Sequence, residues 1–483
     1  MVDWTAFPLL ATATVFILSA LLFFIRSPTP VGRAPRFSYL VGALLGRFNM
    51  KEEGAMDLLW AAYKKHGDMF TLKILHKHIT ILIGAEASAV MYNANDSEVS
   101  SKEIYSFTIP VFGKGIVYDA PTHIMAQQLK FVRHGLGSTL METYCAKIAN
   151  ESAMYFNSWP DAGECDFHKE MSELTALSAS RCLLGDEIRG KISKFGPLYQ
   201  KLSDGLSHIS VLFPYLPTKA HRERDKARAQ IHDLFIEVIE KRREAESKSD
   251  DYLQLLIDSR YRDGQRASND DIVGIMIATL FGGQHTSAIT STWVAFMIAT
   301  HKEPLLKRLL DEQKEVLTAS NGELSVEVVD SMKLLHLAVK ETLRLFPPLI
   351  MLARTALKPL KYKEFVIPKG DILMTCPTLT QRLPEVFKNP DEFDPDRFAE
   401  PRKEDAERFA YQPFGGGRHM CLGNRFGYLQ IKIVISVFLR MFEFELKDPN
   451  WKPKISYEAI VAGPAHGCEI KFKKRPKSEQ FFI

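Results

Sequence analysis

A long apolar run without a single charge opens the chain. It extends from Phe7 to Ile25, and Arg26, Arg33 and Arg36 follow it among several prolines. Because roughly 20 apolar residues cross the hydrocarbon core of a bilayer, the run is long enough to be a transmembrane helix, and the arginines place its downstream side in the cytosol. A cleavable signal peptide is the alternative, but no basic residue precedes the run. We therefore expect a membrane anchor over residues 1–26 and a stiff proline-rich spacer over residues 27–40.

The pattern of residues 41–483 is mostly helical. An almost uniformly apolar stretch from Ile272 to Phe281 predicts a helix that is buried on all sides. This helix runs from about Ser268 to Thr300, with Ser268 as its N-cap and two aspartates suited to the positive end of the helix dipole. Its middle reads Gly-Gly-Gln-His-Thr-Ser over residues 282–287, and paired glycines often kink a helix and free its carbonyls.

Two further helices and one ambiguous segment follow from the pattern. One helix runs from about Val328 to Leu345, where Pro347–Pro348 ends it. The other begins after Gly423, where apolar residues recur near the 3.6-residue period. The segment Tyr105–Tyr118 is apolar and glycine-containing, and it fits a core strand as well as a pocket lining.

Composition changes this picture little. The 483 residues are 46% hydrophobic and 25% charged, which is enough for a large buried core. No repeat, low-complexity run or Gly/Ser-rich linker divides them, so we expect one large domain although the length allows two or three. The net charge of +4 gives no indication of nucleic-acid binding. The six cysteines include no CxxC pair and indicate reduced thiols that face the cytosol.

One of these cysteines, Cys421, has surroundings that suit a metal-bound thiolate. Three consecutive glycines precede it at positions 415–417. Since glycine costs roughly 0.8–1 kcal/mol in a helix interior, they predict a tight loop whose backbone can approach a flat ligand. The helix after Gly423 places Cys421 at a loop–helix junction, where unpaired N–H groups favour a thiolate. The alternative is a buried structural cysteine, the usual fate of a free thiol.

The segment resembles the haem-binding loop of cytochromes P450. That pattern reads Phe-x-x-Gly-x-x-x-Cys-x-Gly, where x is any residue. Its four fixed positions match Phe414, Gly417, Cys421 and Gly423. The resemblance implies a mainly α fold with a small β portion, in which residues 41–483 form a single haem-thiolate catalytic domain behind an N-terminal transmembrane helix. It implies haem b (iron protoporphyrin IX) with Cys421 as the axial iron ligand, whose thiolate favours O–O cleavage.

The order Gly-Gln-His-Thr-Ser in the long helix is similar to the signature of the sterol 14α-demethylases. This resemblance assigns catalytic proton delivery to Thr286 and His285, where most P450s have an acid before the threonine. A histidine suits a proton shuttle because its unperturbed pKa lies near 6.5. The alternative is a histidine that merely caps a kinked turn. Gly282 departs from the family, in which alanine is commoner at that position.

The same resemblance assigns residues that hold the cofactor and the fold. Charge-assisted or hydroxyl bonds to the haem propionates fall to His419, Arg354, Tyr105 and Tyr118. Ala126 stands where some relatives carry a basic partner, and Lys130 or Arg133 can substitute for it. An ionic cluster that holds the fold around the haem is assigned to Glu341, Arg344 and Arg397; the i, i+3 pair within it carries little weight alone.

The substrate pocket is assigned to apolar residues from several segments. They are Phe107, Phe112, Phe281, Leu349, Met351, Leu352, Ile460 and Val461. A rigid tetracyclic sterol would bind them mainly by apolar burial, at about 25 cal/mol per Å². In this family Phe at the position of Phe107 goes with C4-monomethyl sterols such as obtusifoliol, and Leu goes with C4-dimethyl sterols such as lanosterol. The bulky ring crowds a second methyl group.

The resemblance as a whole implies a sterol 14α-demethylase of sterol biosynthesis, which removes the C14 methyl group in three successive oxidations and releases formate. No Rossmann or flavin motif is present, so electrons must come from a separate protein. The resemblance implies that this protein is an NADPH–cytochrome P450 reductase. Lys432 and the basic residues beside the thiolate loop are candidates for docking it, although a charge run is usually a solvated face. We also expect inhibition by azoles, whose ring nitrogen can ligate the iron opposite Cys421.

The expected location is the endoplasmic reticulum membrane, with a single pass and a cytosolic catalytic domain. Two alternative functions stay open: a P450 monooxygenase that acts on another lipid or a xenobiotic, and a haem-thiolate protein that binds a sterol without turnover. Thr286 and His285 argue against the second alternative, because a protein that only binds a sterol needs no proton delivery.

Overall fold

The computed structural model describes residues 36–37, 55–74, 77–244, 249–457, 459–465 and 467–476. The expected anchor over residues 1–26 lies outside the described residues, as does the expected spacer over residues 27–40 apart from Arg36–Phe37. The structure is 56% helical with few strands, which confirms the predicted mainly α fold with a small β portion. Its chain forms two compact units that are interleaved in sequence.

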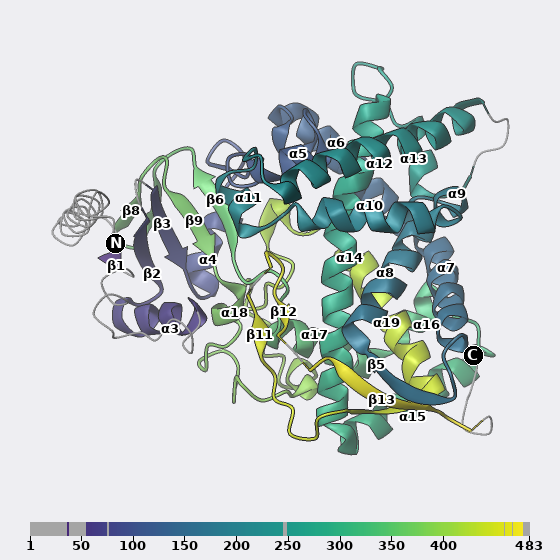
Figure 1. The fold of residues 1–483 in the computed structure, drawn as a ribbon. Coiled ribbons are helices and arrows are strands. Elements are labelled where there is room, and N and C mark those ends of the chain that lie inside the picture. Colours follow the sequence, from purple (N-terminus) through teal and green to yellow (C-terminus); the bar gives the residue numbers. More distant parts are fainter. Residues whose placement is uncertain are drawn as a thin grey trace, which may run out of the picture. The chain divides into compact units, whose positions relative to one another are not determined.

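The first unit, here called the sheet unit, consists of the described residues up to Ile104 together with Met351–Pro390 and Asp405–Arg418. Its strands form one sheet in the order β1 (Arg36–Phe37), β2 (Met69–Ile74), β3 (Lys77–Leu82), β9 (Ile372–Thr375), β6 (Leu352–Ala356) and β4 (Val99–Ser100) (Figure 1). The pairs β1–β2 and β3–β9 are parallel, and the other pairs are antiparallel. The unit also contains α3 (Ala55–His66), α4 (Ala85–Tyr92), α18 (Pro377–Thr380) and the hairpin β7–β8 (Leu360–Tyr362 and Phe365–Ile367).

The second unit, here called the helical unit, consists of Tyr105–Ile350, Asp391–Glu404 and the described residues from His419 onward. Its helices are α5 (Ile109–Phe112), α6 (Thr122–Gly135), α7 (Ser138–Asn157), α8 (Phe167–Leu183), α9 (Asp186–Arg189), α10 (Ile192–Asp204), α11 (His208–Leu212), α12 (Lys219–Glu244), α13 (Tyr252–Asp258), α14 (Asn269–Thr300), α15 (Lys307–Ala319), α16 (Val326–Ser331), α17 (Lys333–Leu345) and α19 (Asn424–Met441). Its strands form a sheet in the order β10 (Phe442–Leu446), β13 (Glu469–Lys474), β5 (Ala162–Asp166), and a pair β11–β12 (Ile455–Ser456 and Gly463–Pro464).

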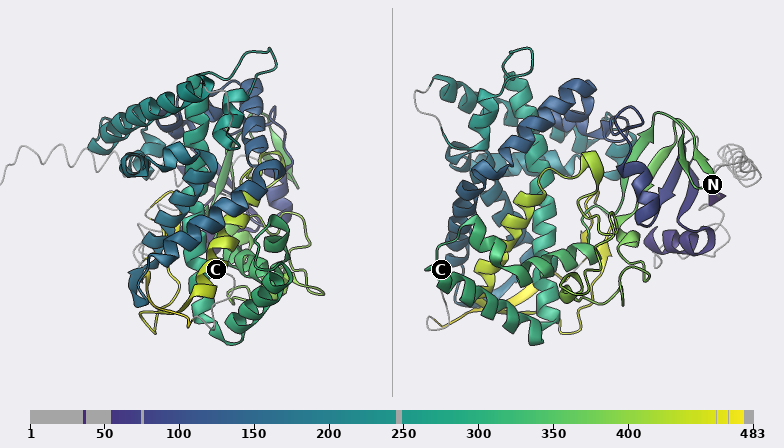
Figure 2. Two further views of the ribbon diagram at one scale, coloured as in Figure 1. Left: turned by 90° about the vertical axis from the view of Figure 1, so that its right-hand side faces the viewer. Right: turned by 180° about the vertical axis from the view of Figure 1, so that it is seen from behind.

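Helix α14 is the long buried helix that the sequence predicts. Ser268 caps it as predicted: its Oγ accepts from Asp271 N at 3.0 Å, and its own N–H donates to Asp271 Oδ2 at 2.9 Å. The helix packs against α8, α17 and α19, and Figure 2 shows α19 lying beside it. Among the residues that the structure describes, α14 alone is long and apolar enough to span a bilayer, and most of its apolar window is buried inside the protein.

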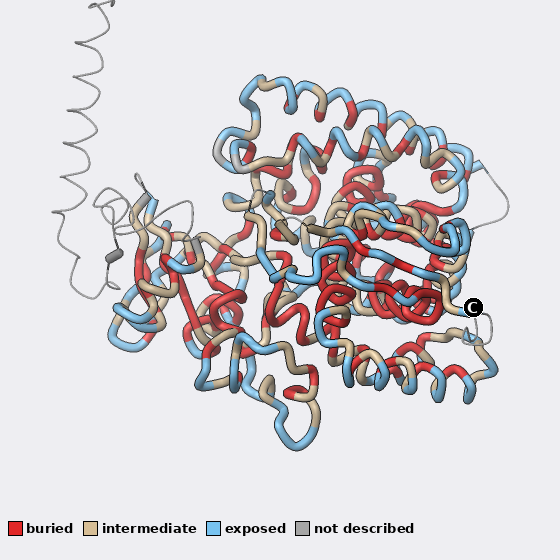
Figure 3. Tube along the Cα trace, turned by 60° about the horizontal axis from the view of Figure 1, so that its bottom comes forward, coloured by how far each residue is buried: buried red, intermediate tan, exposed pale blue. Residues whose placement is uncertain are grey.

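Burial follows the helix faces that the apolar pattern indicates. In Figure 3 buried residues fill the inner turns of the packed helices, and exposed residues follow the outer turns. The helix α19 begins at Asn424, directly after Gly423 as predicted, and nearly all of its residues from Leu429 to Met441 are buried. This packing fixes the start of α19, and with it the loop that carries Cys421.

One local prediction was wrong in form. The helix expected from about Val328 to Leu345 is broken at Met332, whose ψ of 77° is not helical. The break is stabilised from outside, because the Glu312 carboxylate of α15 accepts the N–H groups of Leu334 at 2.5 Å and Leu335 at 3.1 Å. These are among the N–H groups that a helix start leaves without a partner.

The segment Tyr105–Tyr118 contains no strand. It forms a turn at Ser106–Thr108, the short helix α5 and a turn at Val117–Asp119. Pro110 lies in the first turn of α5, where its missing N–H costs nothing. Gly113 ends the helix with a φ of +114°, a conformation that few other residues adopt.

Candidate functional site

The sulfur of Cys421 lies at the loop–helix junction that leads into α19. Desolvation by the surrounding protein raises the pKa of its thiol, and a backbone hydrogen bond from Gly423 opposes this shift. The side chain is nevertheless exposed. An exposed thiol can be reached by a cofactor, as a buried structural cysteine cannot. A cation at the sulfur would reverse the direction of the pKa shift and favour the thiolate.

The glycines before Cys421 are required by the protein itself. A Cβ on Gly417 would lie 1.8 Å from the carbonyl oxygen of Tyr92, and one on Gly416 would lie 2.8 Å from the ring of Phe409. Gly415 and Gly417 also have φ values of +70° and +67°. The sequence analysis explained these glycines by the approach of a flat ligand. The structure gives another reason for Gly416 and Gly417: within the sheet unit, their backbone contacts α4 and Phe409 too closely for any side chain.

The middle turn of α14 is open although the helix is buried on both sides of it. Residues 272–277 and 287–298 are buried, whereas Gly282 is exposed and a Cβ on either Gly282 or Gly283 would meet nothing within 4 Å. The helix continues through these glycines without a break, and Thr286 Oγ1 donates to the Gly282 carbonyl one turn earlier at 2.8 Å. A smooth helical face without Cβ atoms is what a planar macrocycle needs, so these residues fit a haem.

His285, the neighbour of Thr286, lies against helix α10. Its Nε2 is 2.8 Å from Ser203 Oγ, and its ring stacks on Tyr199 with centroids 6.2 Å apart. Desolvation, and to a lesser degree the nearby His168, lowers the pKa of His285, and Asp204 opposes the shift. The imidazole is therefore neutral near pH 7.

The aromatic residues assigned to haem and substrate are assembled in two groups. Tyr105 stacks on Tyr118 with ring centroids 4.6 Å apart and lies 6.2 Å from the ring of Phe107. Phe112 meets Phe281 of α14 edge-on at 6.2 Å, one residue before the open turn. Phe107 and Phe112 are both buried, at 8% exposure.

Two other apolar segments of the predicted pocket, which are distant in the sequence, are joined by a backbone hydrogen bond. Ala462 N donates to Pro348 O at 2.8 Å, which joins the loop of Ile460 and Val461 to the residue before Leu349. Val461 packs against the cluster formed by Ile289, Trp293, Met297, Leu345 and Phe346. These apolar residues therefore belong to the same unit as α14.

Other predicted site residues belong to the sheet unit. Met351 and Leu352 each pack against one of its core clusters. Arg354 lies on β6 opposite Leu373, and its guanidinium donates to the carbonyl of Ala353 at 2.7 Å. Phe414 and Gly417 lie in this unit, and His419 is the first residue of the last segment of the helical unit.

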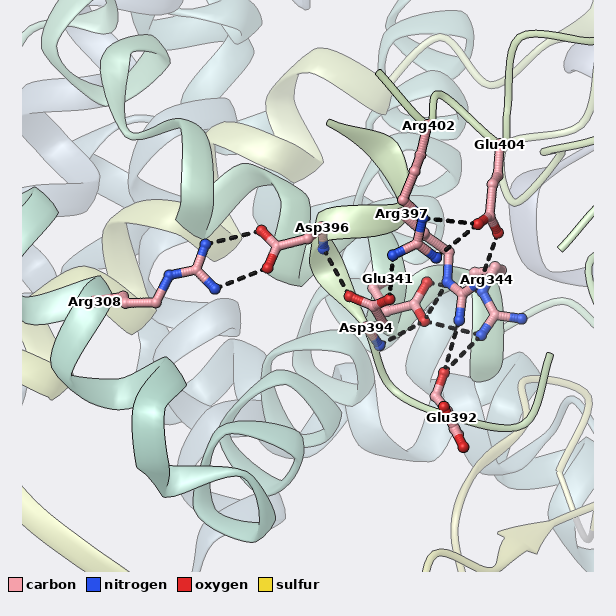
Figure 4. A network of polar contacts seen from close by, with 9 residues as sticks. All are labelled: Arg308, Glu341, Arg344, Glu392, Asp394, Asp396, Arg397, Arg402 and Glu404. Carbon is pink, nitrogen blue, oxygen red and sulfur yellow. Dashed lines mark hydrogen bonds and ion pairs between the residues drawn. The ribbon is translucent and has the colours of Figure 1, made fainter. Parts of the chain in front are cut away.

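The structure brings the fully buried residues Glu341, Arg344 and Arg397 together in one ionic network (Figure 4). Arg344 Nε donates to Glu341 Oε2 at 2.7 Å, and Arg397 Nε donates to Glu341 Oε1 at 2.9 Å. The network is larger than the three residues that the sequence analysis named. Arg397 also binds Glu404 at 2.6 Å, and Figure 4 shows the further members Arg308, Glu392, Asp394, Asp396 and Arg402.

One assignment from the sequence was wrong, and several contacts were missed. Lys432, a candidate for docking a reductase, is only 2% exposed and donates to the carbonyl of Val329. It occupies the buried side of α19 and cannot face a partner. The sequence analysis did not identify Ser203 or Arg228, because their partners lie far away along the chain. It also missed Glu404, although its partner Arg397 is seven residues away.

Comparison with known proteins agrees with this geometry. The family model "Cytochrome P450" matches residues 33–472. A sterol 14-demethylase of Arabidopsis thaliana is 38% identical over 97% of this chain and 97% of its own length. An obtusifoliol 14-alpha demethylase of Triticum aestivum is 40% identical over 93% and 99%, and the lanosterol 14-alpha demethylase of Homo sapiens is 36% identical over 93% and 88%.

Solved structures show the same fold at low identity. The retinoic acid-bound cyanobacterial CYP120A1 superimposes with a TM-score of 0.80 at 20% identity and covers 92% of this chain and 100% of its own. The match of the family model over most of the chain, and relatives of nearly equal length, lead to one conclusion. The chain belongs to the cytochrome P450 family and, within it, to the sterol 14-demethylases.

Proposed function

We propose that this protein is a haem-thiolate monooxygenase that removes the C14 methyl group of a sterol precursor, with release of formate. The observation that carries the proposal is the open turn of α14. It presents Thr286 in residues 281–286, which are less buried than the stretches of α14 on both sides of them, and this helix packs against α19, which follows Cys421. The near full-length relatives named for obtusifoliol and lanosterol support the same reaction.

Cys421 is the residue that would hold the iron of a haem b, and Arg354, His419, Tyr105 and Tyr118 would hold its propionates. A haem ligated by a thiolate supplies oxygen activation when bound, since electron density from the sulfur favours O–O cleavage. Among the described residues no cluster of three or more His, Cys, Asp and Glu side chains could hold a metal ion. A single thiolate ligand from the protein is consistent with this finding.

The protein would handle protons through His285 and Thr286. The Thr286 hydroxyl donates its proton to the Gly282 carbonyl, so its oxygen is left as an acceptor on the open side of the turn. His285 is neutral and contacts Ser203 at its Nε2, and Ser203 precedes the exposed Asp204. A proton from solvent can therefore reach the imidazole by way of the Ser203 hydroxyl.

The apolar residues would orient the sterol and select it. Phe112 and Phe281 form one wall and Phe107 lies beside Tyr105, so the ring system would be bound by burial and would leave its C14 methyl at the open turn of α14. Phe107 favours an obtusifoliol-type, C4-monomethyl sterol over a lanosterol-type, C4-dimethyl sterol. One methyl group is usually worth about 10–200-fold in discrimination.

The protein would work at a membrane with an electron donor. The apolar run up to Ile25 supports a single-pass anchor in the endoplasmic reticulum membrane, with NADPH–cytochrome P450 reductase as the electron source. Exposed apolar side chains also lie in the segment between α10 and α12; they are Ile209, Val211, Phe213, Tyr215 and Leu216. Groups of exposed apolar side chains often mark surfaces that contact a membrane or another protein. Azoles would bind opposite Cys421.

The test is turnover by the full chain with a reductase and NADPH, with obtusifoliol and lanosterol in competition and products identified by mass spectrometry. Loss of the 14-methyl group with formation of formate is the expected result. Cys421→Ala should abolish both turnover and the thiolate-type CO spectrum, whereas Cys468→Ala should keep both. If the parent protein has the normal CO spectrum and consumes neither sterol, the assignment of a sterol substrate is wrong.

A further inference from the structure

The loop that carries Phe112 is held between two helices of the helical unit. Helix α5 contacts both α12 and α14, and these helices lie side by side with it in Figure 1. The Phe112 ring meets Phe281 of α14, while the Phe112 carbonyl faces Gly274 of the same helix. A Cβ on Gly274 would lie 2.6 Å from that carbonyl oxygen, so only glycine lets the loop come this close to α14.

On its other side the loop is bound by Arg228 of α12. Arg228 Nε donates to the carbonyl of Val111 at 3.1 Å, and its Nη2 donates to the carbonyl of Phe112 at 3.2 Å. Both carbonyls belong to the last turn of α5, which has no further helical N–H to bond them. A Cβ on Gly113 would lie 2.4 Å from the same guanidinium nitrogen, so this glycine makes room for Arg228.

The far end of the loop has a different anchor. Gln128 of α6 is fully buried, accepts from Val117 N at 2.7 Å and donates to Gly115 O at 3.0 Å. Gln128 is neutral and acts on the residues after Gly113, whereas Arg228 acts on the residue that touches Phe281. The two anchors therefore fix different parts of the loop, and only Arg228 acts directly on Phe112.

Burial of the charged Arg228 guanidinium costs desolvation free energy that an arginine on the surface does not lose. Arg228 is partly buried, and desolvation lowers its pKa, with Asp270 and Asp225 opposing the shift. Two hydrogen bonds from a charged donor offset this desolvation. A desolvated charge on two backbone carbonyls indicates a position that the loop must keep.

We propose that Arg228 is a positioning residue for the substrate, which holds Phe112 against Phe281 and thereby sets the width of the sterol pocket on that side. The inference rests on the proposed function and deepens it. Without the guanidinium, the Phe112 carbonyl would move away from α12, and the ring would no longer close the pocket at a fixed distance from α14.

The test uses the haem-loaded full chain and three variants. Arg228→Met removes both hydrogen bonds, Arg228→Lys keeps a charge that can reach one carbonyl, and Arg228→Gln keeps a neutral donor in place of the charged one. The control is Arg243→Met, because Arg243 lies on the same helix and also donates to a backbone carbonyl, that of Ala267 at 3.2 Å, away from this loop.

For Arg228→Met we expect KM and the Kd for the sterol to rise about tenfold, which is the loss expected for hydrogen bonds from a charged donor. The kcat should change less than KM, and the preference between obtusifoliol and lanosterol should weaken. Arg228→Lys should recover part of the affinity, and Arg243→Met should match the parent. If Arg228 had only a structural role, Arg228→Met would lower only the amount of protein with a normal CO spectrum. The proposal is overturned if the protein that keeps this spectrum has the same KM and the same sterol preference as the parent.

Hydrogen exchange separates failure of this inference from failure of the proposed function. In the sterol-free, haem-loaded chain, the amides of residues 109–117 should exchange faster in Arg228→Met than in Arg243→Met. Equal exchange overturns the inference whether or not a sterol is turned over. If the parent demethylates neither sterol, the proposed function fails, and the exchange experiment still decides whether Arg228 holds the loop.

Discussion

The carboxylate of Glu341 holds together the buried ionic network of the helical unit. It is fully buried and accepts from Arg344 at 2.7 and 2.9 Å, from Arg397 at 2.9 Å and from the backbone N–H of Asp394 at 3.0 Å. Arg397 has a second carboxylate partner in Glu404. Removal of the charge of Glu341 should therefore affect Arg344 most.

We predict that Glu341→Gln lowers the free energy of unfolding by about 3–5 kcal/mol, the cost of leaving one partner of a buried ion pair without the other. The stability of a folded protein is about 5–15 kcal/mol in total, so the variant should lose a large part of it. In Glu341→Gln an NH2 group also replaces one carboxylate oxygen, so that a donor faces a guanidinium, which is itself a donor. Little of the variant should therefore retain haem at 37 °C.

The assay is urea unfolding of the haem-loaded protein, followed by the thiolate-type CO spectrum. The control lies in the same network (Figure 4): Asp396→Asn breaks the pair with Arg308, whose two bonds are both 2.8 Å but whose side chains are 46% exposed. Such an exposed pair is worth about 0–1 kcal/mol. If Glu341→Gln cost no more than Asp396→Asn, the reasoning from burial would be refuted.

Three further variants test function and pH. Ser203→Ala should lower kcat several-fold with little change in sterol Kd, because it removes the contact of His285 Nε2; unchanged kcat would exclude this proton route. Burial lowers the pKa of Lys432 from 10.5 to about 8, so the unfolded state binds more protons between these values, and stability relative to Lys432→Met should rise from pH 8 to pH 10.5; a flat difference in urea unfolding would contradict it. The same variant should leave the KM for the reductase unchanged, and a raised KM would restore Lys432 as a docking residue. Phe107→Leu should shift the turnover ratio from obtusifoliol toward lanosterol, and an unmoved ratio would remove Phe107 as the selecting residue.

Local chemistry explains what was predicted correctly. Ser268 and Asp271 satisfy each other's backbone groups within four residues, so the start of α14 can be recognised without knowledge of the rest of the fold. The start of α19 after Gly423 is similar, because the change from loop glycines to a helical apolar period is local. The mainly α fold and the cysteine loop follow from signals of this kind.

Contacts between distant segments explain what was missed. The break at Met332 depends on Glu312, some twenty residues earlier, which binds the N–H groups of Leu334 and Leu335. The burial of Lys432 depends on α16, whose Val329 carbonyl accepts its ammonium group. Neither contact leaves a mark in the residues next to Met332 or Lys432.

The sequence by itself determined the chemistry of the site: a cysteine at a loop–helix junction, a threonine after a histidine in a buried helix, and an apolar wall to accompany them. Only the tertiary structure decided which atoms those residues meet. It placed His285 on Ser203, filled the space beside Gly417 with the Tyr92 carbonyl, and brought Arg228 to the carbonyls of Val111 and Phe112. The physical reason is that hydrogen-bond and packing partners are selected by proximity in space, and more than 80 residues separate each of these pairs in the chain.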